Sequence, residues 1–142
     1  MNDDRLTIRI DNDLSEVAQV AEAVEDFCAR NAVPAKAAYH VSLVIDEALT
    51  NTISYGFPAG GRHQIDLEVE RRGEDILIEL IDGGAAFNPL DAPEPDLDAP
   101  LQERQIGGLG VHLMRTLMTE AAYRREGGRN HLSLRKRFGS EG

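Results

Sequence analysis

The chain has 142 residues, 42% hydrophobic and 28% charged, and this length and composition predict one soluble globular domain over residues 1–142. Acidic residues outnumber basic ones by 25 to 15, for a net charge of −10, which argues against direct nucleic-acid binding and against adsorption to anionic membranes. The single cysteine, Cys28, excludes an intrachain disulfide and a multi-cysteine zinc site, and it is expected in the core. An acidic start and short apolar runs predict a cytoplasmic protein without a membrane span.

The first part of the chain predicts a strand followed by two helices. Residues 6–10 alternate between apolar and polar types, as in a short strand. Asp13 is typical of a helix cap, and Glu16 three positions later gives a pattern close to a capping box. Pro34 is typical of the start of a second helix, which we expect to end before the glycine- and proline-rich cluster at 56–61.

The remainder predicts two hairpins separated by a long loop and a helix. Alternating apolar residues at 64–71 and 75–81 predict the first hairpin. Residues 83–108 show no periodicity and are rich in proline and aspartate, which indicates a loop. A helix over 108–119 and a closing hairpin over 120–137 complete the order. This order predicts an α+β fold, a two-layer α/β sandwich with helices on one face of a mostly antiparallel, mixed sheet.

The second predicted helix carries the run Asp46-Glu47-Ala48-Leu49-Thr50-Asn51. Glu47 and Asn51 are four residues apart, so their side chains project from the same side of the helix. An amide oxygen can be a ligand of hydrated Mg²⁺, and a carboxylate can deprotonate a nearby nucleophile. A solvated polar face is the alternative explanation of the pair.

The apolar strand at 75–81 ends in Asp82-Gly83-Gly84. A carboxylate at this place can accept a hydrogen bond from an exocyclic amine such as that of adenine, and glycines let a flat ring approach the backbone. An ordinary turn after a strand is the alternative.

A third motif, Gly107-Gly108-Leu109-Gly110, directly precedes the predicted third helix. Glycines at a helix start can present backbone N–H groups to phosphate oxygens. The motif lacks the Gly-Lys-[Ser/Thr] ending of a P-loop and does not follow a strand, so neither common nucleotide fingerprint applies. A flexible hinge is the alternative.

In this order, the three motifs resemble the N, G1 and G2 boxes of the GHKL ATP-binding superfamily, which has a Bergerat-type fold. The short chain and its Glu-Ala-Leu-Thr-Asn sequence resemble the bacterial anti-sigma-factor serine/threonine protein kinases, over roughly residues 5–137. The larger histidine-kinase, gyrase and chaperone branches carry further domains that do not fit this length. One position departs from the pattern, since Ala86 stands where the last G1 glycine is expected.

The resemblance implies a role for each matching residue. Glu47 would be the general base toward the substrate hydroxyl, and Asn51 the Mg²⁺ ligand. Residues 89–106 would form the ATP lid. The residues that would bind the nucleotide are Asn51, Asp82, Gly84, Arg104, Gly108, Leu109 and Gly110.

The implied function is that of a Mg²⁺-ATP-dependent serine/threonine protein kinase and anti-sigma factor. It would phosphorylate an anti-sigma-factor antagonist in a partner-switching module and hold a sigma factor or another client inactive. The resemblance also implies a homodimer that uses the strand at 6–10. The alternatives are an ATP-binding sequestering module without significant kinase activity and an ATPase-type sensor. Glu47 favours the kinase, because a module that only binds ATP has no use for a base.

Overall fold

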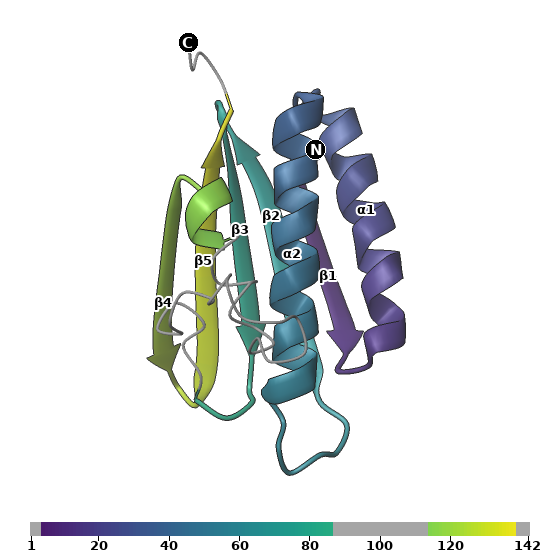
Figure 1. The fold of residues 1–142 in the computed structure, drawn as a ribbon, viewed down its shortest axis with the longest axis vertical. Coiled ribbons are helices and arrows are strands. Elements are labelled where there is room, and N and C mark those ends of the chain that lie inside the picture. Colours follow the sequence, from purple (N-terminus) through teal and green to yellow (C-terminus); the bar gives the residue numbers. More distant parts are fainter. Residues whose placement is uncertain (1–3, 87–113, 139–142) are drawn as a thin grey trace, which may run out of the picture.

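A five-stranded sheet is covered on one face by two long helices in the computed structural model, which describes residues 4–86 and 114–138 (Figure 1). The strands are β1 (Arg5–Asp11), β2 (Gln64–Arg72), β3 (Asp75–Asp82), β4 (Glu120–Glu126) and β5 (Arg129–Arg137), in the spatial order β1-β2-β3-β5-β4. The helices are α1 (Val17–Arg30) and α2 (Ala35–Tyr55), and Pro34 immediately precedes α2. The predicted α+β sandwich is confirmed. Every described pairing is antiparallel, so the mixed character expected of the sheet is absent from this part of the chain.

The start of α1 differs in one respect from the predicted capping box. Asp13 caps a short 3₁₀ helix, Leu14–Glu16, and its side chain accepts a hydrogen bond from the Ser15 amide at 2.9 Å, which lowers the pKa of Asp13. In a capping box Glu16 would bond the amide of the capping residue. Its carboxylate instead accepts from the amide of Asp11, at 3.0 Å. The Glu16 side chain therefore links the start of the helix to the end of β1 through a hydrogen bond.

The core lies between the sheet and the helices. Buried side chains alternate along β2, β3 and β5 and recur at helical spacing on α1 and α2, as the sequence predicts. Its main members are Val20, Val24, Phe27, Cys28, Val41, Val44, Ile45, Leu49, Ile65, Leu67, Val69, Ile76, Ile78, Leu80, Leu132 and Leu134. Burial raises the pKa of the Cys28 thiol, and this residue is part of the core as expected.

A two-residue turn between β4 and β5 sets the register of the closing hairpin. Gly127 and Gly128 have φ angles of +61° and +76°. Positive φ at both central residues is what the favoured two-residue hairpin turn requires, and glycine adopts it without steric penalty. β5 also pairs with β3, and there Asp82 lies directly opposite Asn130.

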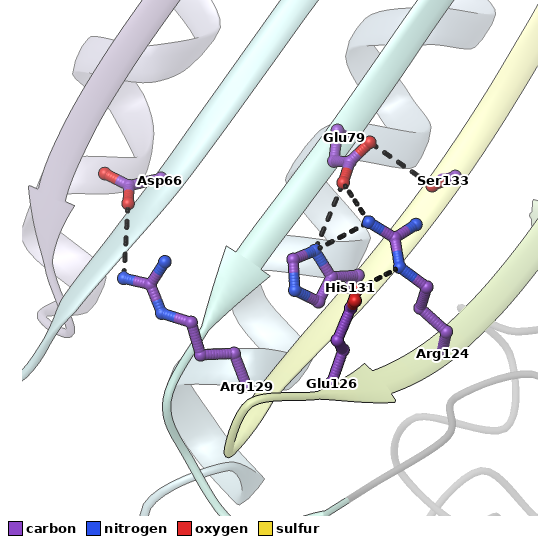
Figure 2. A network of polar contacts seen from close by, with 7 residues as sticks. All are labelled: Asp66, Glu79, Arg124, Glu126, Arg129, His131 and Ser133. Carbon is purple, nitrogen blue, oxygen red and sulfur yellow. Dashed lines mark hydrogen bonds and ion pairs between the residues drawn. The ribbon is translucent and has the colours of Figure 1, made fainter.

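The sheet face opposite the helices carries charged side chains (Figure 2). The Glu79 carboxylate lies 3.2 Å from His131 Nδ1 and 3.5 Å from Arg124 Nη2, and it accepts a hydrogen bond from Ser133 Oγ at 3.4 Å. Glu79 and Arg124 carry opposite charges on a partly exposed surface, where such a pair adds little to stability.

The predicted third helix is described only at its carboxyl end. Residues 114–117 are helical, and Met114 and Met118 are buried. The helix thus ends at residue 117, two residues earlier than predicted. Residues 87–113, which include the predicted lid at 89–106 and the start of this helix, lie outside the described residues. None of the described helices combines the length and hydrophobicity that crossing a membrane requires.

Candidate functional site

Asn51 is a buried amide near the carboxyl end of α2. The buried stripe of this helix passes through Val44 and Ala48, and Asn51 occupies its next position. Its side chain is 4% exposed, and within the described residues its Nδ2 atom has no hydrogen-bond partner. A buried polar group left without a partner is unfavourable, and in a native protein such a group is explained by a functional role or by a bound water or ion.

Glu47 lies one turn before Asn51, on the same side of α2. Its side chain is half-buried. Burial raises the pKa of Glu47, and the neighbouring carboxylate of Asp46 raises it further. A carboxylate with a raised pKa is a stronger proton acceptor when it is ionised, so this environment suits a general base.

Asp82 is a buried carboxylate at the end of β3. The alternation of that strand places it on the sheet face that packs against the helices, where it is 6% exposed. Its Oδ1 atom accepts hydrogen bonds from the Gly84 amide at 2.8 Å and from Asn130 Nδ2 at 3.0 Å. No group among the described residues donates to Oδ2, so this oxygen can accept a hydrogen bond from a ligand.

Gly84 lies too close to the end of α2 to carry a side chain. A Cβ atom there would be 2.3 Å from the Gly56 carbonyl oxygen and 3.0 Å from Asp82 Oδ1. The Ala85 amide donates to the same Gly56 carbonyl at 2.8 Å. The ends of β3 and α2 therefore meet at one end of the sandwich (Figure 1). This contact gives Gly84 a role that its motif does not predict.

Asn130 and Arg125 also belong to this site, although the sequence analysis does not single them out. Asn130 is 6% exposed and donates to Asp82, and Arg125 Nη1 donates to the Gly84 carbonyl at 2.8 Å. A signal for Asn130 is present in the sequence. It is the first of three alternating positions on β5 that face the core, and the other two are leucines. A polar residue at such a position has to find partners.

The residues of this site could supply one oxygen ligand, from the Asn51 amide, to a hydrated Mg²⁺ ion. The described residues contain no group of three His, Cys, Asp or Glu side chains that could hold a metal. Mg²⁺ typically keeps several waters and takes only one or two protein oxygens. The unpartnered Nδ2 atom of Asn51 supports this fit, because the amide oxygen and nitrogen exchange places when the group rotates by half a turn. The other expected nucleotide contacts, Arg104, Gly108, Leu109 and Gly110, lie outside the described residues.

Residues 10–136 match the family described as histidine kinase-like ATPase domain. The chain is also 34% identical, over 111 residues, to the serine/threonine-protein kinase BtrW of Bordetella bronchiseptica, and this match covers 78% of each protein. The two findings confirm the family that the three motifs indicate.

Solved structures share the fold at lower identity. The RsbU and RsbW domains of a Mycobacterium tuberculosis protein match with a TM-score of 0.62 at 15% identity, over 94% of this chain and 32% of that one. A chain of the SiaB–SiaC complex from Pseudomonas aeruginosa matches with a TM-score of 0.61 at 17% identity, over 92% and 88%. This chain thus spans about a third of the first structure and most of the second. Its fold, its buried site and its sequence similarity agree, and the chain belongs to the histidine kinase-like ATPase domain family.

Proposed function

We propose that this protein is a Mg²⁺-dependent kinase that transfers the γ-phosphoryl group of ATP to a serine or threonine of an anti-sigma-factor antagonist. The observation that carries the proposal lies at the end of the sandwich, where the buried Asn51 Nδ2 atom lacks a described partner and the buried Asp82 carboxylate has one oxygen available. The similarity to a serine/threonine-protein kinase supports it.

Nucleotide binding is assigned to the residues at this end. Asp82 Oδ2 accepts a hydrogen bond from the 6-amino group of adenine, and the loop containing Gly84 lines the ring. Asn51 supplies one oxygen ligand to Mg²⁺. When bound, the metal neutralises charge that develops on the phosphate oxygens. We assign the phosphates to the backbone of Gly108, Leu109 and Gly110, and the γ-phosphate or a protein partner to Arg104 in the lid at 89–106.

Glu47 acts as the general base. Its carboxylate accepts the proton of the substrate hydroxyl as the bond between that oxygen and the γ-phosphorus forms. The bond from the γ-phosphorus to the bridging oxygen breaks, and ADP leaves with the electron pair. The raised pKa of Glu47 favours this role, because its ionised carboxylate accepts a proton more readily than that of an ordinary glutamate.

Charge repulsion explains how phosphorylation makes the kinase exchange the antagonist for another binding partner. A phosphate adds almost two negative charges to the antagonist, and this chain has a net charge of −10. Repulsion then weakens the complex and frees the kinase to hold a sigma factor or another client inactive in the cytoplasm. A homodimer through β1 is part of the same proposal.

The test is phosphoryl transfer from labelled ATP, with Mg²⁺, to small candidate antagonist domains. We expect the wild-type protein to label a serine or threonine. Glu47→Gln should retain ATP affinity and lose transfer, whereas Glu22→Gln, an exposed glutamate on α1, should behave like the wild type. ATP binding without transfer to any candidate would favour the sequestering module. Rapid phosphate release without a protein substrate would favour the ATPase-type sensor.

A further inference from the structure

The side-chain amide of Asn130 has all four of its hydrogen-bonding positions occupied. Its Nδ2 group donates to Asp82 Oδ1 at 3.0 Å and to the Ala85 carbonyl at 2.9 Å. Its Oδ1 atom accepts from the Tyr123 hydroxyl at 2.5 Å and from Arg125 Nη1 at 3.0 Å. An asparagine amide has two N–H donors and two oxygen lone pairs, so this set is complete.

These partners permit only one orientation of the amide. Arg125 can only donate, and the Ala85 carbonyl can only accept. Rotation of the Asn130 amide by half a turn would place its NH₂ group against the guanidinium and its oxygen against the Asp82 carboxylate. Arg125 of the edge strand β4 thus determines which atom of Asn130 faces Asp82, and the Tyr123 hydroxyl adds a second hydrogen bond to the same Asn130 oxygen.

The orientation of Asn130 in turn fixes the Asp82 carboxylate. Oδ1 receives two donors, the Asn130 amide and the Gly84 backbone N–H, so rotation of the carboxylate would break both bonds. Oδ2 then points its lone pairs in a fixed direction and can only accept. A ligand with an amino group at that position satisfies it, whereas a ligand with a carbonyl oxygen, or with only a C–H group, does not.

We propose that Asn130 is a positioning residue that makes the site selective for a purine with a 6-amino group. The inference rests on the proposed ATP site and adds to it a residue outside the three motifs. Asn130 acts through Asp82, and Tyr123 and Arg125 act through Asn130. Selectivity for the base is thereby coupled to the closing hairpin of the sheet.

A comparison of two nucleotides distinguishes a positioning role of Asn130 from a general structural role. ATP carries the 6-amino group, and purine riboside triphosphate has hydrogen at that place. We would measure the affinity of both by calorimetry with Mg²⁺ for the wild type, Asn130→Ala and Tyr123→Phe. Ser133→Ala is the matched control, because it lies on the same strand but on the opposite sheet face.

We expect the wild type to bind ATP more tightly than purine riboside triphosphate. Asn130→Ala should weaken ATP binding by about tenfold or more, the size expected when a hydrogen bond to a charged group is lost. The same substitution should weaken the binding of purine riboside triphosphate by less than about threefold, because that nucleotide makes no hydrogen bond to Asp82. Tyr123→Phe, which preserves the ring, should reduce the preference for ATP over purine riboside triphosphate to a smaller extent. This variant provides the test if Asn130→Ala does not fold.

The inference would be overturned if the Asn130 and Tyr123 variants bound both nucleotides equally more weakly, or if their preference for ATP over purine riboside triphosphate were unchanged. Either result would leave the proposed function standing. Failure of the wild type to bind ATP would refute both.

Discussion

Replacing Gly84 by alanine tests the contact that joins the loop after β3 to the end of α2. The added Cβ would lie 2.3 Å from the Gly56 carbonyl oxygen, whereas ordinary contacts begin near 3.4 Å, so the loop has to retreat by roughly 1 Å. That shift breaks the 2.8 Å bond from the Ala85 amide. Overpacking costs about 1–3 kcal/mol and the lost hydrogen bond about 1 kcal/mol, so we expect a loss of about 2–4 kcal/mol.

For a domain of this size, such a loss lowers the melting temperature by roughly 6–15 °C. Thermal and denaturant unfolding measure it, and calorimetry should show weaker ATP binding, because the same Cβ lies 3.0 Å from Asp82 Oδ1. Gly83→Ala is the matched control. That neighbouring glycine has no atom within 4 Å of an added Cβ and no left-handed backbone, so stability should change by less than about 0.5 kcal/mol. Equal effects of the two substitutions would refute the packing argument.

Three further predictions concern the core, a turn and the proposed base. Phe27→Ala should destabilise the fold by about 3–5 kcal/mol in denaturant unfolding, whereas Tyr39→Ala, at a 64% exposed position, should have little effect. Gly128→Ala should lower stability by about 1–2 kcal/mol and Gly128→Asn by less, because a φ of +76° is left-handed; equal losses would contradict this. The acid limb of the transfer rate should lie above the pKa of an ordinary glutamate, since burial raises the pKa of Glu47 and activity disappears as falling pH protonates it. Asp46→Asn should move that limb to lower pH, and an unmoved limb would contradict the assignment.

Most of the fold could be predicted from the sequence, because its signals are periodic and local. Apolar alternation predicted β2 and β3 with an error of one residue at one end, and the glycine pair predicted the hairpin between β4 and β5. The exact start of α1 could not be predicted. It depends on whether Glu16 bonds Asp13 or Asp11, and that choice requires the position of β1 relative to the helix.

The site was predictable only where a residue departs from the pattern of its own element. Asn51 interrupts an apolar stripe and Asp82 ends an apolar strand, so both stand out in the sequence. The roles of Arg125 and of the Gly56 carbonyl depend on segments far apart in the chain that meet at the end of the sandwich. Such contacts follow from the strand order and leave no local sequence signal.

Calorimetric titration with ATP tests the central claim most directly. With Mg²⁺ present, the wild-type protein should bind one ATP with saturable heat, and removal of the metal should weaken binding. Asp82→Asn should remain folded and lose most of the affinity, because an NH₂ group replaces one of the oxygens that accept hydrogen bonds. An absence of heat with the wild type, or equal affinity of the wild type and a folded Asp82→Asn variant, would contradict the account.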